Sequence, residues 1–183
     1  MNIHAGRIHD RSQQDDAGLT LIEVIIYIVV GGIVLTMLAS VFINGMRVDA
    51  ATRDRDVATG TAQSISSSIA MSVRNASDLR VNGNELRARV AVGASNWQCR
   101  VWYFDGSALR YKSYTPGGAI PAASTTWKAL GTGVHSAPPT APFTQHGKRV
   151  EFALTVTVED ATVPIAGSAV ARAIQEGTPA PCW

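Results

Sequence analysis

A long apolar run near the start of the chain constrains the fold more than any other feature of the sequence. Between Leu19 and Ile43 the residues are apolar, small or weakly polar, and the single charged side chain is Glu23. A helix of that length spans roughly 37 Å at about 1.5 Å per residue, more than the roughly 30 Å of hydrocarbon in a bilayer. The run therefore predicts a helix that crosses a membrane with some tilt.

A polar leader of 18 residues precedes this run and ends at Gly18. Its composition does not supply an apolar core. The run that follows is also longer than the roughly 7–15 apolar residues of an ordinary secretory signal. We therefore expect residues 1–18 to be a leader peptide that is removed by a route other than the cleavage of an ordinary secretory signal.

The position of Glu23 needs compensation, because an ionised carboxylate near the bilayer centre costs about 2.5 kcal/mol or more. One interpretation places Glu23 in the hydrated interface at the first turn of the helix, where the helix dipole favours an acid. In the other interpretation, cleavage after Gly18 gives Leu19 a new α-amino group, and the carboxylate neutralises this cation when subunits pack together in lipid. We favour the second.

A family resemblance is carried by the segment Gly18-Leu19-Thr20-Leu21-Ile22-Glu23. With the apolar run after it, this segment resembles the cleavage and methylation motif of type IV prepilins and pseudopilins. The resemblance implies that a prepilin peptidase cuts between Gly18 and Leu19 and methylates the new N-terminus. It also implies that Glu23 pairs with the amine of a neighbouring subunit during assembly. Many members have a basic residue before the glycine and Phe after it, whereas this chain has Ala17 and Leu19.

The same resemblance implies a place and a set of partners. The leader is expected in the cytoplasm and the rest of the chain outside it, first as a single-pass membrane protein and then in a cell-surface or periplasmic filament. The partners are other pilin subunits, prepilin peptidase, an inner-membrane assembly platform and the lipid bilayer. The acidic residues before the cut and the lack of a recognisable pseudopilin calcium loop favour a minor pilin. The alternatives are a pseudopilin of a type II secretion or DNA-uptake (competence) system, and a single-pass membrane-anchored binding protein.

The rest of the chain predicts an α+β fold, in which a long N-terminal helix packs on a small antiparallel β-sheet, as in pilins. Residues 19–43 form the membrane-spanning or filament-core half of the helix. Residues 44–75 continue it as an amphipathic segment, because four apolar residues recur at helical spacing. These are Val57, Ile65, Ile69 and Val73.

Residues 76–183 are expected to form an extracytoplasmic head. Alternating and β-rich patterns predict strands at 85–92, 98–104, 108–114 and 150–159, and a last strand near 168–174. Residues 115–147 are dense in Pro, Gly and Ser and predict a long surface loop. Trp127, Leu130 and Val134 are expected to pin the middle of this loop to the domain.

The two cysteines, Cys99 and Cys182, lie far apart in the sequence. A bridge between them would close a long loop and stabilise the head by about 4–5 kcal/mol, and the alternative is two free buried thiols. An extracytoplasmic head favours the disulfide.

Motifs of catalysis are missing from the sequence. It contains no Gly-x-Ser-x-Gly elbow, no His-Glu-x-x-His pair and no phosphate-binding loop, so we expect no enzyme, no cofactor and no metal site. A net charge of +2 does not by itself imply nucleic-acid binding. Arg87 and Arg89 on one strand face, with Arg110 and Lys112 on another, are candidates for binding DNA or another polyanion, although a solvated sheet face is the favoured interpretation.

Overall fold

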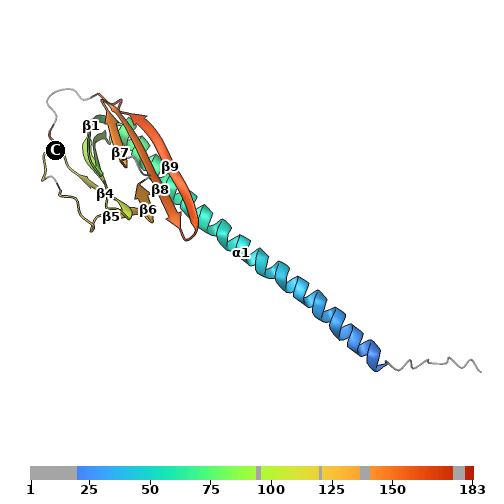
Figure 1. Cartoon of the computed structure of the whole chain (residues 1–183). Coiled ribbons are helices and arrows are strands. Elements are labelled where there is room, and N and C mark those ends of the chain that lie inside the picture. Colours follow the sequence, from blue (N-terminus) through green and yellow to red (C-terminus); the bar gives the residue numbers. More distant parts are fainter. Residues whose placement is uncertain (1–19, 94–95, 120, 137–140, 175–179) are drawn as a thin grey trace, which may run out of the picture. The chain divides into compact units, whose positions relative to one another are not determined.

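The structure is a computed structural model that describes residues 20–93, 96–119, 121–136, 141–174 and 180–183. These residues form one helix and nine strands (Figure 1). The chain divides into two compact units, Met1–Met46 and Arg47–Trp183. Helix α1 (Leu21–Arg74) begins in the first unit and ends in the second, which also contains every strand. One long helix with antiparallel sheets confirms the predicted α+β class.

The first sheet is an antiparallel meander of five strands in the order β1-β2-β3-β4-β5. Its strands are β1 (Ala76–Asn82), β2 (Glu85–Ala91), β3 (Trp97–Phe104), β4 (Ala108–Tyr114) and β5 (Lys128–Thr132). Gly83 between β1 and β2 and Gly106 between β3 and β4 have φ angles of 57° and 102°. Glycine adopts such angles without the steric cost that a side chain brings, which permits these short connections.

The second sheet is built around its longest pair of strands. It comprises β6 (Val134–Ser136), β7 (Phe143–His146), β8 (Arg149–Val158) and β9 (Ala161–Val170). Strand β9 pairs with β8 along its whole length, while β6 and β7 share the opposite edge of β8. In Figure 1 this sheet is the orange to red group of arrows.

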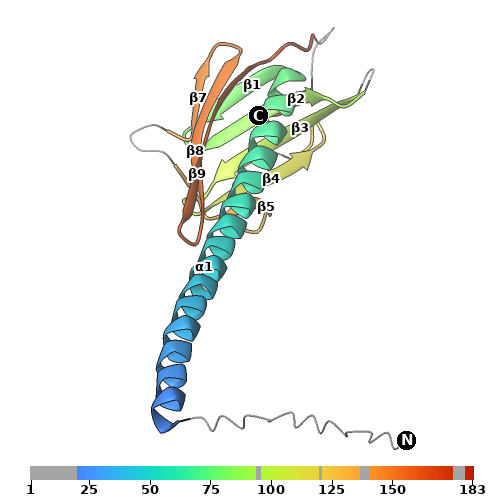
Figure 2. The same ribbon diagram turned by 90° about the vertical axis from the view of Figure 1, so that its right-hand side faces the viewer.

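The hydrophobic core lies where the last part of α1 meets both sheets. The buried apolar residues of α1 recur every three or four positions, and they are Ala58, Ala62, Ile65, Ile69 and Val73. Trp102 from β3 and Leu154 from β8 belong to the same cluster. Figure 2 shows the green end of α1 among the strands of both sheets. One face of this part of the helix thus supports the whole second unit.

A side chain joins the two sheets at the edge of β1. The backbone N–H of Val81 donates to Oε1 of Gln145 at 2.9 Å, and Nε2 of Gln145 donates to the carbonyl oxygen of Leu79 at 3.1 Å. The amide of Gln145, from β7, therefore bonds to β1 as a neighbouring backbone would. It satisfies two polar groups that the edge of the sheet would otherwise leave unpaired.

Two details of the helix and of the last strand differ from the sequence-based expectations. Val57 is 58% exposed, and Ala58 takes the buried position instead. Gly131 of β5 comes so close to α1 that an added Cβ would lie 2.7 Å from Cγ2 of Thr61, so β5 needs a residue without a side chain at this position. The last strand is Ala161–Val170 and not 168–174, because it pairs directly with β8 through a tight turn.

The prediction that residues 115–147 form a long surface loop is wrong. Residues 115–147 contain β5, β6 and β7, so this segment completes one sheet and supplies two strands of the other. The expected anchors do pack against the domain: Trp127 and Val134 are buried, and Leu130 is half-buried against the core. The second unit therefore has two antiparallel sheets where a single short one was expected.

Candidate functional site

The first turn of α1 presents the one carboxylate of the apolar run. Thr20 precedes the helix, and its carbonyl oxygen accepts the backbone N–H groups of Glu23 and Val24 at 3.0 and 3.2 Å. The hydroxyl oxygen of Thr20 also accepts the N–H of Glu23 at 3.4 Å. A threonine followed three residues later by glutamate is the pattern of a helix N-cap. Glu23 therefore lies where the positive end of the helix dipole favours a negative charge.

The carboxylate of Glu23 has a partner on its own helix. The hydroxyl of Tyr27, one turn later, donates a hydrogen bond to Oε1 of Glu23 at 2.9 Å. Residues four apart lie side by side on a helix surface, so this contact follows from the spacing. Gly18 and Leu19, the expected cleavage and methylation positions, lie outside the described residues.

The helix surface after Glu23 is apolar and uncovered. An 18-residue window of α1 has a mean hydropathy of 2.6 and is not buried at all, so α1 is long and apolar enough to cross a membrane. Its hydroxyl groups need no water: Thr36 donates to the carbonyl oxygen of Gly32 at 2.8 Å, and Ser40 donates to that of Thr36 at 2.9 Å. Such internal bonds suit a helix in lipid, where unpaired polar groups are costly.

A comparison with known families identifies this region. The prokaryotic N-terminal methylation motif matches residues 14–39, a range that includes Gly18, Leu19 and Glu23. This is the type IV pilin-like prepilin signature, which confirms the resemblance. The chain thus carries the N-terminal motif of type IV pilin-like proteins, which supports processing by prepilin peptidase. Together with the apolar helix, this motif supports a membrane-anchored single-pass protein. No curated protein and no solved structure matches the chain.

The motif also bears on partners and activity. Other pilins and prepilin peptidase are the partners that it implies, and it points to a structural subunit rather than an enzyme. Among the described residues, no group of three or more His, Cys, Asp or Glu side chains is placed to hold a metal ion.

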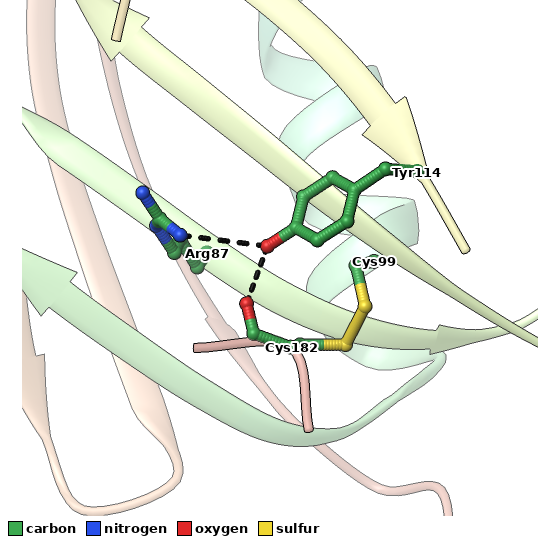
Figure 3. Close-up of a disulfide and its surroundings, with 4 residues drawn as sticks. All are labelled: Arg87, Cys99, Tyr114 and Cys182. Carbon is green, nitrogen blue, oxygen red and sulfur yellow. Dashed lines mark hydrogen bonds between the residues drawn. A yellow bond between two sulfur atoms is a disulfide. The ribbon is translucent and has the colours of Figure 1, made fainter. Parts of the chain in front are cut away.

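The second unit carries a covalent link between the sheet and the end of the chain. A disulfide joins Cys99 of β3 to Cys182, with 5.6 Å between the Cα atoms and 83 residues of separation (Figure 3). Beside it, the backbone N–H of Gly117 donates to the carbonyl oxygen of Pro181 at 2.8 Å. The segment 180–183 is therefore held on the face of the first sheet that points away from α1.

Tyr114 and Arg87 extend this attachment, as Figure 3 shows. The hydroxyl of Tyr114 donates to the carbonyl oxygen of Cys182 and accepts a bond from Nη1 of Arg87 at 3.5 Å. Burial raises the pKa of Tyr114, and the nearby charge of Arg87 offsets only part of this rise. Burial acts to lower the pKa of Arg87, but its hydrogen bond and ion pair with Glu85 outweigh burial and leave the pKa raised. Both side chains keep their ordinary protonation states at neutral pH.

Arg89 is buried, which the interpretation of a solvated sheet face did not anticipate. Only 7% of the residue is exposed, and its guanidinium carbon lies 5.5 Å from the ring centroid of Trp183. A guanidinium over an indole face is a favourable cation–π arrangement. Its Nε has no hydrogen-bond partner within the described part of the chain. The aromatic residue beside the disulfide therefore covers this cation.

The other two basic candidates, Arg110 and Lys112, differ in their contacts. Nε of Arg110 pairs with Asp105, and its Nη1 donates to the carbonyl oxygen of Trp127 at 3.2 Å. Burial alone would raise the pKa of Asp105, but bonds from the backbone N–H of Ser107 and from Arg110 lower it to about 2. Lys112 is exposed. All four basic residues lie on one face of the sheet, since β2 and β4 align through β3.

Sequence reasoning missed two members of these sites. Tyr27 was not connected with Glu23, although a spacing of four residues on a predicted helix is the signal that would have found it. Trp183 was not placed over Arg89, because only the folded sheet and the disulfide bring these distant residues together.

Proposed function

We propose that the protein is a minor pilin, a structural subunit of a type IV pilus-like filament. In this proposal prepilin peptidase cuts between Gly18 and Leu19, and Leu19 becomes the N-methylated terminus. The carboxylate of Glu23 then pairs with the terminal amine of a neighbouring subunit. The leader is cytoplasmic, the head is extracytoplasmic, and an inner-membrane assembly platform lifts the subunit into the filament.

The observation that carries the proposal is an uncovered apolar helix with a carboxylate in its first turn. Leu21 and Ile22 are 80% and 65% exposed, and further along Phe42 is 74% exposed. Burying each such side chain is worth about 1.5–3 kcal/mol, so the helix requires lipid or other apolar helices around it. A filament core of packed helices supplies the second environment, and an N-terminal amine there would satisfy Glu23.

We propose matching roles for the segments of the chain. Residues 1–18 are the leader peptide, residues 19–43 the membrane and filament-core helix, and residues 44–75 its amphipathic continuation. Residues 76–183 are the head, which the link between Cys99 and Cys182 stabilises outside the cytoplasm.

The first test is intact mass and N-terminal analysis of the protein from its native membrane. We expect a mature start at N-methylated Leu19 in the wild type and an unprocessed chain in Gly18→Val. Gly31→Val is the matched control, since nothing lies within 4 Å of a Cβ added there, and it should be processed normally. A start at Met1 in wild-type cells with an active prepilin peptidase would contradict the proposal.

A second test separates processing from assembly. Glu23→Gln should be cleaved as the wild type is, but should remain in the membrane and be missing from filaments sheared from the cell surface. Shearing also distinguishes the alternatives: a minor pilin is released with surface filaments, whereas a pseudopilin of a secretion or competence system stays in the cell envelope.

Polyanion binding is a secondary hypothesis with a narrower basis. Arg87 and Arg110 are paired with carboxylates and Arg89 lies under Trp183, so Lys112 is the member of the set best placed to meet DNA. Salt-sensitive binding that Lys112→Ala weakens would support this hypothesis. Equal binding by this variant and the wild type would contradict it.

A further inference from the structure

The hydrogen bond between Tyr27 and Glu23 is the one side-chain contact that the described residues offer to this carboxylate. It joins the hydroxyl of Tyr27 to Oε1 at 2.9 Å. No hydrogen bond reaches Oε2 of Glu23 from any residue that the structure describes. Within the described residues, one oxygen of Glu23 therefore has a partner on its own helix, and the other has none.

The other hydroxyl groups of the apolar run serve the backbone. Thr20 caps the helix by accepting the N–H of Glu23, while Thr36 and Ser40 donate to carbonyl oxygens one turn earlier. Tyr27 differs from these, because its hydroxyl donates to a charged side chain. Hydrogen bonds in which the acceptor is ionised are stronger than those between neutral groups, and their strength grows as water is excluded.

We propose that Tyr27 is a positioning residue for Glu23: its hydroxyl holds Oε1 so that Oε2 faces the cationic amine of a second copy of the chain. This inference rests on the proposed function, in which Glu23 pairs with such an amine. A carboxylate accepts several hydrogen bonds, so the bond from Tyr27 persists when the amine arrives. The same bond compensates Glu23 while the subunit is stored in lipid without a partner.

The test removes only the donor. Tyr27→Phe keeps the ring and its apolar surface, and Thr36→Val is the matched control, because it removes a hydroxyl that is bonded to the backbone far from Glu23. The measurement is the ratio of sheared filament protein to membrane protein in cells that express the full chain. We expect Tyr27→Phe to lower this ratio about tenfold, equivalent to about 1.4 kcal/mol, and Thr36→Val to leave it unchanged.

A spectroscopic measurement detects the bond without assembly. In lipid vesicles that hold the full chain, the ultraviolet resonance Raman doublet of tyrosine reports hydrogen bonding at the phenol, and subtracting the spectrum of Tyr27→Phe isolates the signal of Tyr27. We expect this signal to change from strong donor to weak donor when Glu23 is replaced by Leu. A signal that Glu23→Leu leaves unchanged would overturn the proposal, whatever the amount of filament.

The outcomes separate this inference from the proposed function. If Glu23→Gln assembles as the wild type does, the assembly role of Glu23 fails, and the role of Tyr27 fails with it. If Glu23→Gln abolishes assembly but Tyr27→Phe assembles normally, only the positioning role is refuted. If Tyr27→Phe accumulates poorly in cells, the difference spectrum of wild type minus Glu23→Leu tests the bond without that variant. A shift of the tyrosine doublet toward weak donor supports the positioning role, and an unchanged doublet refutes it.

Discussion

Replacing Cys99 and Cys182 together by serine is expected to lower the free energy of unfolding of the second unit by about 4.5 kcal/mol. The two residues are 83 positions apart, so the disulfide closes a long loop in the unfolded chain. The loop-entropy relation gives about 3 kcal/mol for a 15-residue loop and about 4.7 kcal/mol for a 100-residue loop at 25 °C. A loop of this size lies near the upper value. The loss is comparable to the entire stability of many domains.

The assay is urea unfolding of the full chain in detergent micelles, followed by tryptophan fluorescence. Trp102 and Trp127 are buried in the second unit, so their emission reports its unfolding. Wild-type protein under reducing conditions is the matched control, and it should unfold near the serine variant. The slope of the free energy against urea concentration should also rise, because the unlinked chain exposes more surface when unfolded. A loss below about 1 kcal/mol would refute the loop-closure reasoning.

Tyr114→Phe shows whether the disulfide also keeps segment 180–183 in place. In the oxidised protein, losing the hydrogen bond to the carbonyl oxygen of Cys182 should cost about 1 kcal/mol. In the double serine variant, the same substitution should cost little, because the released segment no longer offers its carbonyl group. Equal costs in both backgrounds would mean that the segment stays docked without the covalent link.

Three further predictions concern the second unit and are read by denaturant or acid unfolding. Gly133→Ala should cost about 2–4 kcal/mol, because Gly133 has a φ of 66° and an added Cβ would lie 2.2 Å from the carbonyl oxygen of Thr157; an unchanged urea midpoint would contradict this. The folded-state pKa of Asp105 is about 2, below the ordinary 3.8, so its stabilisation is present above pH 3.8 and is lost as the pH falls toward 2. Asp105→Asn should therefore lose less stability than the wild type across that pH window, and parallel acid profiles would argue against the role of this carboxylate. Ile65→Ala should cost about 2–5 kcal/mol, whereas Val57→Ala, at an exposed position, should change stability by less than about 0.5 kcal/mol.

Strong local patterns made much of the fold predictable. The strands near residues 85–92, 98–104, 108–114 and 150–159 alternate or are rich in β-formers, and each occurs in the structure within one or two residues. The long N-terminal helix was also predictable from a local pattern. A segment so long and so uniformly apolar is typical of a membrane-spanning helix. The N-terminal motif likewise depends on a short contiguous segment, which the family comparison confirmed.

The strands that were missed depend on partners far away in the sequence. Strands β5 and β6 are five and three residues long and contain small or polar residues, so no local alternation marks them. Strand β9 was misplaced because Pro164 and Gly167 both argue against a strand. Proline is tolerated there because, among the described strands, β9 pairs only with β8 and so lies at the edge of its sheet.

In the candidate sites, too, features marked by the local sequence were predictable and contacts between separated residues were not. Glu23 was identified from its local context, whereas its contact with Tyr27 required the spacing of two polar residues to be read together on one helix. The burial of Arg89 was not predictable from β2 alone, because the covering ring of Trp183 comes from a segment more than ninety residues later.

The amide of Gln145 has a consequence for how copies of this protein behave at high local concentration. An open strand edge offers unpaired N–H and C=O groups to any extended segment of another molecule, and proteins that crowd together aggregate through such edges. Here one side-chain amide engages the N–H of Val81 and the carbonyl oxygen of Leu79 on β1. An extended segment of a neighbouring copy therefore meets an edge of β1 at which these two backbone groups are already bonded, which disfavours the growth of a shared sheet through β1.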